Sequence, residues 1–348
     1  MASYKSHLAT LCKGSEGFAA RRSVFLNHRY GASHILKPVL DGDDSAFFTN
    51  GDDETLQQAW AHENGLKSRK LDDILLAQIE AHRTEVFYNL DPMRYDGSFL
   101  QRLPGHVRRK IAWRAAPGKI DFRGYDLIVA NIPTMLARYQ ADKLPTAEFF
   151  PAHDPELDAY AANTERDIDV LFVGGYSRHH VNRSQLLQAV AWLQDRYNVV
   201  FHLDRSRLTR LAESPLGMLP PLSKHRRPGP VRSISRPPVF GRQMYEALSR
   251  AKIVVNMSID MAGADRGNMR CFEALGAKSL LLSDAGVYPK GMEDGKSLRT
   301  YSTPEDAVRC ITSALSSQAW QQTAERGFNM IRTSYSKGVQ MARFMQLT

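Results

Sequence analysis

Acidic and amide side chains gather in the stretch 256–276. Asp265 and Glu273 are separated by seven residues, and Asn268 precedes a short run with helical spacing. Asparagine is favourable at a helix start, where free backbone N–H groups can bind phosphate. We therefore expect Asp265 to contact hydroxyl groups of a ligand and Glu273 to accept hydrogen bonds from a ribose diol. A structural alternative is that Glu273 pairs with Arg270, three residues earlier.

A second stretch, Phe172–Arg183, combines two glycines with cations. We expect a strand to end at Gly174 and Gly175 and a helix to begin shortly afterwards. Glycine lets the backbone approach a ligand closely, and arginine can bind phosphate through two parallel hydrogen bonds. Arg178 and Arg183 are therefore candidates for binding a diphosphate. The alternative is an ordinary glycine turn, and the absence of G-x-G-x-x-G disfavours an oxidoreductase.

Short β-like runs alternate with helix-like runs along the chain, which is typical of βαβ units and parallel sheets. Strands are predicted in the first half at Ser23–Asn27, Ala46–Thr49, Val86–Asn89, Lys110–Trp113, Leu127–Asn131 and Ala147–Phe150, with helices at Asp53–Asn64 and Leu71–Ala81. A second set of strands is predicted at Asp169–Val173, Val199–Leu203, Ile253–Met257 and Ser279–Ser283. Its helices are predicted at Asn182–Arg196, Arg242–Ala251, Met269–Leu275, Pro304–Leu315, Gln318–Arg332 and Lys337–Gln346. The boundary lies near 151–168, so the sequence predicts an α/β protein with two Rossmann-like domains.

The composition of the 348 residues, 43% hydrophobic and 24% charged, is typical of globular domains. The sequence contains no run of 18 or more apolar residues, so we expect no membrane-spanning helix. The first residues lack the apolar core of a signal peptide. Cys12, Cys271 and Cys310 have neither zinc spacing nor a C-x-x-C motif, so we expect reduced thiols in the cytoplasm.

The net charge of +9 is concentrated in the second half of the chain. Residues 1–163 carry 20 Lys and Arg against 21 Asp and Glu, whereas residues 164–348 carry 26 against 16. This basic half could attract a phosphate-bearing ligand, a nucleic acid or an anionic membrane face. Within it, the stretch Arg205–Pro238 is rich in Pro, Arg and Ser, and we expect a long mobile loop. No Phe, Tyr or Trp is interleaved with its arginines, which disfavours binding to nucleic-acid bases.

The stretch Phe240–Asp284 resembles the donor-binding domain of GT-B glycosyltransferases, most closely the branch related to CgeB-like spore-maturation proteins. The shared pattern is a strand ending in Asn, here Asn256, followed by R-x-F-E-A-x-G, here Arg270–Gly276. The wider clan of group 1 glycosyl transferases carries E-x7-E, and this chain has Asp265 at the position of the first Glu. The stretch Asp169–Arg183 is similar to the clan's phosphate-binding strand and loop.

This resemblance implies the GT-B fold, in which two Rossmann-like domains with parallel sheets face each other across a cleft. Residues 1–155 would bind the acceptor, residues 165–335 the nucleotide sugar, and a C-terminal helix, 336–348, would cross back to the first domain. The resemblance also implies catalysis without a metal or other cofactor, which agrees with the absence of a D-x-D motif at a plausible strand end, and the nucleotide sugar is the donor substrate. The residues expected around this donor are Gly174, Gly175, Arg178, Arg183, Asn256, Asn268, Met269, Arg270 and Glu273, with Asp265 as a catalytic candidate. The acceptor would be a glycan, a lipid-linked sugar or a protein, and the basic half allows peripheral contact with the inner membrane face.

A base for the acceptor hydroxyl is expected at the carboxyl ends of strands in the first domain. Asp91 and His28 each follow a predicted strand, and Arg114, His153 and Asp154 are further polar candidates. Each has a structural alternative: a turn at Asp91, a half-buried histidine at His28, an ion pair at Arg114 and a hinge at His153 and Asp154. A retaining reaction needs no such base, and the acid-x7-acid pair favours retention.

Two other functions stay open at this point. A sugar-nucleotide epimerase of the GT-B type would use the same fold and would release free nucleotide and free sugar. A nucleic-acid-binding protein would use the basic half, although the sequence shows no RNA-binding motif.

Overall fold

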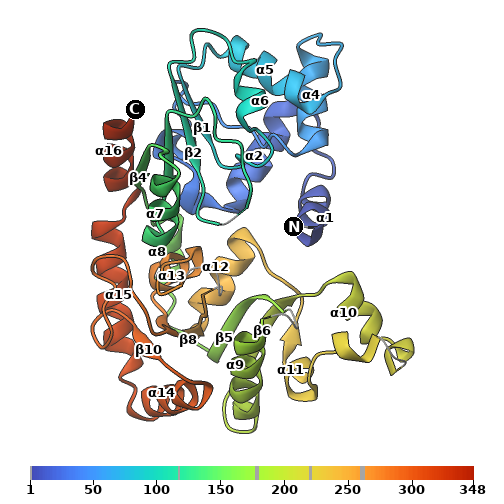
Figure 1. The fold of residues 1–348 in the computed structure, drawn as a ribbon. Helices are drawn as coiled ribbons and strands as arrows, with labels where there is room; N and C mark the ends of the chain where they lie inside the picture. The colour runs from blue at the N-terminus through green and yellow to red at the C-terminus, as the bar shows by residue number, and fades with distance from the viewer. Residues whose placement is uncertain (1, 117, 177–179, 219–221, 259–262) are drawn as a thin grey trace. The chain divides into compact units, whose positions relative to one another are not determined.

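The computed structural model of the protein describes residues 2–116, 118–176, 180–218, 222–258 and 263–348. The chain divides into two compact units (Figure 1). The N-terminal unit comprises Met1–Pro151, Met261–Asp265 and Lys337–Thr348, and the C-terminal unit comprises Ala152–Asp260 and Arg266–Ser336. Each unit contains one parallel sheet with helices packed against it, which confirms the predicted α/β class.

The sheet of the N-terminal unit has four parallel strands in chain order: β1 (Val86–Asn89), β2 (Arg109–Trp113), β3 (Leu127–Ala130) and β4 (Thr146–Glu148). Successive side chains of a strand point to opposite faces, so each face has its own apolar cluster. One cluster joins Ala112 and Ile128 to α5 (Leu71–Ala81), α6 (Gly97–Leu100) and α7 (Pro133–Ala141). On the other face, Ile111 and Val129 pack with Phe344.

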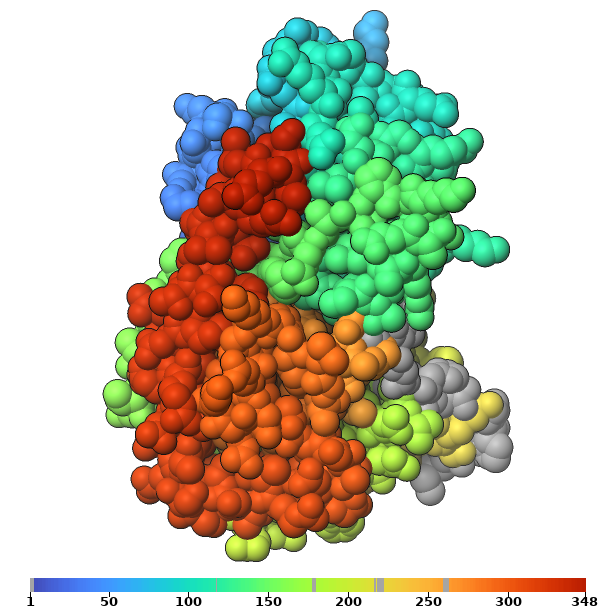
Figure 2. All heavy atoms as spheres, turned by 60° about the vertical axis from the view of Figure 1, so that its left-hand side comes forward, coloured from blue at the N-terminus to red at the C-terminus, as the bar shows by residue number. Residues whose placement is uncertain are grey.

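Phe344 belongs to α16 (Lys337–Leu347), which is the last helix of the chain and part of the N-terminal unit. The Lys337 ammonium is buried and donates to the backbone oxygens of Ala32 and, at 2.6 Å, of Ile35. Arg109 in turn donates from Nε to the Leu347 oxygen at 3.0 Å. Figure 2 shows α16 in dark red on the surface of this unit, beside blue and green segments.

The first part of the N-terminal unit is helical, and two strand predictions there are wrong. Its elements are α1 (Ala2–Leu11), α2 (Gly17–His28), a 3-10 turn (Ala32–His34), α3 (Lys37–Asp41) and α4 (Glu54–Glu63). The predicted strand Ser23–Asn27 lies inside α2, and Ala46–Thr49 has no regular structure. Phe18 and Phe25, seven residues apart, are both buried, a spacing that suits one face of a helix.

The sheet of the C-terminal unit has six parallel strands in the order β10-β9-β8-β5-β6-β7. They are β10 (Arg299–Tyr301), β9 (Leu280–Asp284), β8 (Ala251–Val255), β5 (Ile168–Gly175), β6 (Val199–Asp204) and β7 (Ser235–Arg236). Buried side chains of β5, β6, β8 and β9 pack with α9 (Val181–Ala191) and α14 (Pro304–Ser317) in one apolar cluster. The chain builds the sheet outward from β5 in one direction and from β8 in the other.

The remaining helices of the C-terminal unit are α8 (Glu156–Ala161), α10 (Arg207–Ala212), α11 (Gly229–Ser233), α12 (Gly241–Ser249), α13 (Met269–Gly276) and α15 (Trp320–Ser334). Three 3-10 turns lie at Trp192–Asp195, Pro215–Met218 and Leu222–His225. The prediction of a long loop over Arg205–Pro238 is therefore wrong, because α10, α11 and β7 lie within it and Val231 is fully buried. In the described part of the chain, no helix combines the length and the apolar character needed to span a membrane.

Candidate functional site

The carboxyl ends of β5 and β8 meet where the strand order of the six-stranded sheet reverses. In open parallel sheets, ligands bind outside the carboxyl ends of the strands at such a point. Gly174 and Gly175 end β5, and Asn256 directly follows β8. A Cβ atom added to Gly175 would meet no heavy atom of the described residues within 4 Å. Gly175 therefore leaves bare backbone at this edge of the sheet, whereas a Cβ on Gly174 would lie 3.0 Å from the Phe172 ring.

Asn256 is buried, and both the nitrogen and the oxygen of its side-chain amide are hydrogen-bonded. Its Nδ2 donates to Ser283 Oγ at 2.9 Å, and its Oδ1 accepts from Asn268 Nδ2 at 3.2 Å. Its backbone oxygen accepts from the Tyr301 hydroxyl at 2.8 Å. Asn256 thus ties the ends of β8, β9 and β10 to the residue that precedes α13.

Asn268 occupies the cap position of α13, as predicted, with extended backbone angles of φ −60° and ψ 164°. Its side chain makes no capping bond to the helix and bonds to Asn256 instead. Gly267, one residue earlier, has φ 111°, a conformation that side chains rarely allow. Met269 is the first residue of α13, and the positive end of the helix dipole at this start favours an anion.

Glu273 and Arg270 form an ion pair on α13, as the structural alternative anticipated. Arg270 Nη1 lies 2.7 Å from Glu273 Oε2, and the two side chains are 17% and 7% exposed. Burial raises the pKa of the Glu273 carboxyl, and the Arg270 guanidinium opposes this rise. Arg270 Nε is buried without a hydrogen-bond partner among the described residues. The pair holds a carboxylate in the second turn of a helix whose start faces the sheet edge.

Arg183 brings a cation to the same edge from the first turn of α9. Its Nη2 donates to the Met257 oxygen at 3.2 Å, so the guanidinium reaches across to the residue that follows Asn256. The other predicted cation, Arg178, lies outside the described residues. The structure therefore brings Gly174, Gly175, Arg183, Asn256 and the start of α13 together around the ends of β5 and β8.

Arg266 and Asp284 are residues of this region that the sequence analysis missed. Arg266 Nε lies 2.6 Å from Asp284 Oδ2, and both side chains are largely buried. Asp284 also accepts from the Ser258 backbone N–H at 2.9 Å, which shapes the chain after β8. The position of Arg266, two residues before the predicted cap Asn268, was the available signal. Its partner Asp284 lies 18 residues further along the chain, so the sequence did not indicate the pair.

Asp265 has a different environment from the one predicted. It is buried in the short segment that belongs to the N-terminal unit. Its Oδ2 accepts from the backbone N–H of Thr134 at 2.6 Å and from the Thr134 hydroxyl. Because Thr134 is in the first turn of α7, the carboxylate acts as a cap for that helix. Its contact with a sugar stays a prediction.

Asp91 and Arg114 follow neighbouring parallel strands, β1 and β2, and so lie at the same edge of the four-stranded sheet. Asp91 is exposed, and its backbone oxygen accepts from the N–H groups of Arg94 and Tyr95, both at 3.1 Å. This is the turn that the structural alternative anticipated, with the carboxylate facing solvent. Arg114 Nε donates to the Ala116 oxygen at 2.7 Å, so the guanidinium is held by its own loop.

The position predicted for His28, after a strand, is wrong. His28 is the last residue of α2, and its Nε2 lies 3.1 Å from Nε2 of His7. The ring also stacks on Tyr4, with 5.9 Å between centroids. His28 therefore belongs to a buried aromatic cluster within the helical part of the N-terminal unit, because the segment before it is a helix.

His153 and Asp154 serve as packing residues of the C-terminal unit. His153 Nε2 lies 2.8 Å from Asp158 Oδ1, and burial lowers the pKa of this histidine. Asp154 Oδ2 accepts from the Tyr245 hydroxyl at 3.0 Å. These bonds give both residues a structural role within this unit, and the hinge stays a prediction.

The described residues contain no group of three or more His, Cys, Asp or Glu side chains that could hold a metal ion. A metal-independent reaction stays a prediction.

Comparison with known proteins finds one family model and several solved structures that are similar to this chain. Residues 218–346 match the model of the family described as "Glycosyl transferase-like". The chain is similar to a glycosyltransferase from Rickettsia africae ESF-5, with a TM-score of 0.53 and 11% identity over 89% of this chain and 86% of that one. It is also similar to sucrose-phosphate synthase from Thermosynechococcus elongatus, with a TM-score of 0.51 and 11% identity over 84% of this chain and 78% of that one.

A third similar structure is the pneumococcal O-GlcNAc transferase GtfA in complex with UDP and GlcNAc, with a TM-score of 0.51 and 8% identity over 79% of this chain. The match covers 59% of that chain, so this protein spans well under two thirds of it. A comparison with curated proteins found no match. At these identities the likeness shows the fold, which is GT-B.

Proposed function

We propose that the protein, a glycosyl transferase-like chain with the GT-B fold, transfers a sugar from a nucleotide-sugar donor to an acceptor. The observation that carries the proposal is the edge of the six-stranded sheet at β5 and β8. Bare glycine backbone at Gly175, Arg183 and the start of α13 converge there. The family match over residues 218–346 includes β8 and α13, and Gly175 and Arg183 precede it.

The diphosphate of the donor is the group that suits this edge. During glycosyl transfer, negative charge builds on the departing phosphate, and fixed positive groups stabilise it most effectively where water is excluded. Arg183 and the start of α13 supply such groups, and Gly175 lets the phosphate approach the backbone. Arg178 would add a second cation. No metal is required in this scheme.

We assign the Arg270–Glu273 pair to the ribose of the donor. Arg270 binds Glu273 through Oε2, so Oε1 is the oxygen that we assign to a ribose hydroxyl. The bond to Arg270 fixes the rotamer of the carboxylate before the donor arrives, which reduces the entropy lost on binding.

The N-terminal unit would bind the acceptor, a glycan, a lipid-linked sugar or a protein. Asp91 is the base that we propose for an inverting reaction, because its carboxylate is exposed at the carboxyl end of β1. In a retaining reaction, which the acid-x7-acid spacing favours, the departing phosphate would accept the proton instead. The three cysteines are free thiols, which supports a cytoplasmic enzyme, in peripheral contact with the inner membrane face if its acceptor is lipid-linked.

Calorimetric titration without metal tests the donor site. UDP is the first nucleotide to titrate, because GtfA was crystallised with UDP, and GDP, CMP and dTDP follow. We expect micromolar binding of one nucleotide, lost in Glu273→Gln and kept in Glu246→Gln, which changes an exposed glutamate on α12. Equal binding by both variants, or binding of no nucleotide at all, would refute the donor site.

A transfer assay then separates the two reactions of this fold. A nucleotide sugar consumed together with a glycosylated acceptor supports the transferase. Free nucleotide and free sugar without any transferred product would favour the epimerase.

A further inference from the structure

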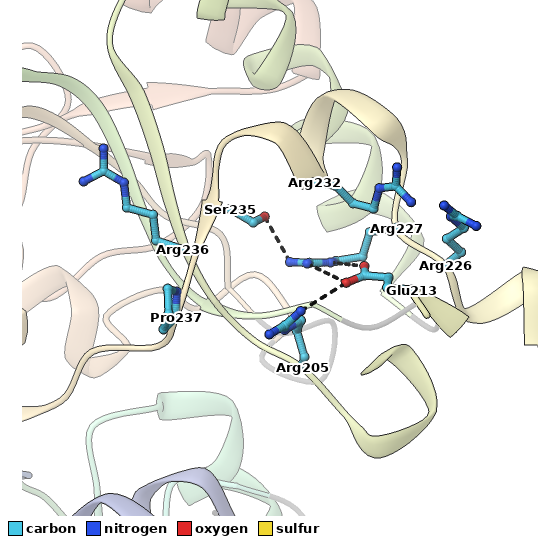
Figure 3. Close-up of a pocket in the computed structure, with 8 residues that line it drawn as sticks. All are labelled: Arg205, Glu213, Arg226, Arg227, Arg232, Ser235, Arg236 and Pro237. Carbon is cyan, nitrogen blue, oxygen red and sulfur yellow. Dashed lines mark hydrogen bonds and ion pairs between the residues drawn. The ribbon is translucent and has the colours of Figure 1, made fainter. Parts of the chain in front are cut away.

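The segment after β6 surrounds a cavity of about 360 Å³ in the C-terminal unit (Figure 3). The side chains that line it are Arg205, Glu213, Arg226, Arg227, Arg232, Ser235, Arg236 and Pro237. Five of these eight residues are arginines and one is an acid. The cavity therefore carries a strong excess of positive charge.

The one carboxylate of the cavity is already bound. Glu213 accepts from Arg227 Nε at 2.5 Å and from Arg227 Nη2 at 2.9 Å, and both side chains are less than 10% exposed. Arg205 Nη1 lies 3.4 Å from the same carboxylate, and Arg227 Nη1 donates to Ser235 Oγ at 3.0 Å. This linked group at the centre of Figure 3 forms the wall of the cavity. The lining thus holds one carboxylate and five guanidinium groups.

The other arginines come from different parts of the segment. Arg226 precedes α11, Arg232 is within α11, and Arg236 is in β7. In Figure 3, Arg226 and Arg232 lie on one side of the linked group and Arg236 on the other. Arg232 Nε is buried and has no hydrogen-bond partner among the described residues. A buried donor without a partner costs about 1–3 kcal/mol. Like charges around one cavity also repel, so an anion in the cavity would relieve both costs.

We propose that this cavity is a second anion site, which binds a phosphate-bearing ligand. Guanidinium groups bind phosphate through paired hydrogen bonds, and several of them around one cavity suit a group with more than one phosphate charge. A water molecule occupies about 30 Å³ in the liquid, so the cavity has room for a diphosphate. The same chemistry is found in a soluble phosphorylated compound and in a phosphorylated lipid headgroup.

The site is separate from the donor site proposed above. Its residues lie between Arg205 and Pro237 and include none of the groups at the ends of β5 and β8. Loss of one site should therefore leave the other intact, and the two can be tested independently.

The double variant Arg226→Gln/Arg232→Gln tests the proposal on the full chain. It spares Arg227, whose removal would take two of the three guanidinium contacts from the buried Glu213 carboxylate and leave only Arg205 at 3.4 Å. Arg207→Gln/Arg210→Gln is the matched control, because it removes two exposed arginines of α10 that do not line the cavity. The probes are inorganic pyrophosphate, titrated calorimetrically, and vesicles of phosphatidylcholine with and without phosphatidic acid. UDP is titrated in parallel, and Arg183→Gln reports any pyrophosphate bound at the donor site.

We expect pyrophosphate binding to weaken roughly tenfold or more in Arg226→Gln/Arg232→Gln, because two charge-assisted donors are lost. Binding in the α10 control and binding of UDP should not change. Recruitment to phosphatidic acid vesicles that is lost in the same double variant would identify a lipid headgroup, and pyrophosphate binding without recruitment would identify a soluble ligand. Equal pyrophosphate affinity in both double variants, or loss of affinity only in Arg183→Gln, would overturn the proposal.

Discussion

The ion pair between Arg270 and Glu273 allows stability and donor binding to be measured separately. Removing one partner of a buried pair leaves the other charge uncompensated, which costs about 3–5 kcal/mol. Arg270 is 17% exposed and its Nε already has no partner among the described residues, so we expect Glu273→Ala to lie in the upper part of this range. A typical domain is stable by about 5–15 kcal/mol, so the loss would be a large fraction of the total.

Replacing both partners by apolar residues should have a much smaller effect. A buried pair exchanged for hydrophobic side chains of similar volume is often neutral or stabilising. We expect the free energy of unfolding of Arg270→Met/Glu273→Leu to lie within about 2 kcal/mol of that of the unaltered protein. Urea unfolding followed by circular dichroism, with linear extrapolation to water, measures both changes.

The double variant also isolates the binding role of the pair. A ligand that binds the folded state raises its stability by RT ln(1 + [L]/Kd). The nucleotide that binds the unaltered protein should raise its unfolding midpoint and should have no effect on Arg270→Met/Glu273→Leu. The reasoning fails if Glu273→Ala costs less than about 1 kcal/mol. It also fails if the double variant loses as much stability as Arg270→Met and Glu273→Leu do in sum when each is made alone.

Three further changes test other parts of the structure. Asp265→Ala removes the cap of α7 at Thr134 and should cost about 0.5–2 kcal/mol in urea unfolding, whereas Asp265→Asn, which keeps an acceptor oxygen, should cost less. Gly175→Val should leave the unfolding free energy within about 1 kcal/mol, because the space around Gly175 is open, and should abolish nucleotide binding in calorimetry; unchanged affinity would contradict the assignment of this edge. Burial, together with Lys337, lowers the pKa of His34 to about 3, while the unfolded histidine titrates near 6.5. The unfolded state therefore binds more protons between these values, so stability should fall as the pH drops from 7 to 4, and His34→Gln should flatten this dependence in urea midpoints.

The sequence located most elements whose periodicity is long or whose strands are fully buried. The bounds predicted for Leu71–Ala81 and Val86–Asn89 agree with α5 and β1. The strand predicted at Ser23–Asn27 is wrong, because a run of four or five residues with apolar members is compatible both with a strand and with one turn of a helix. The helical signal was the spacing of Phe25 from Phe18, which lies before that window and packs in one apolar cluster with Leu56 and Trp60 of α4.

The segment Arg205–Pro238 shows what composition alone misses. Its many Pro, Arg and Ser residues favour disorder, yet the pairing of Glu213 with Arg227, 14 residues apart, and the burial of Val231 fix short helices there. The candidate site shows the same difference between local signals and tertiary contacts. Gly174, Gly175, Asn256 and Asn268 were found because each lies at the end of a predictable element. The pair of Arg266 with Asp284 depends on the tertiary fold and gave no local signal.

The position of α16 has a consequence for how the protein is made. The N-terminal unit is discontinuous, since one face of its sheet is covered by Phe344 and two of its backbone oxygens are bound by Lys337. On the ribosome, these residues emerge only after the whole C-terminal unit has been synthesised. Until then, Ile111, Trp113 and Val129 have an incomplete cover, and domains of a nascent chain ordinarily fold in order from the N-terminus. In this chain the second unit can finish folding first, and the unit begun earliest closes last.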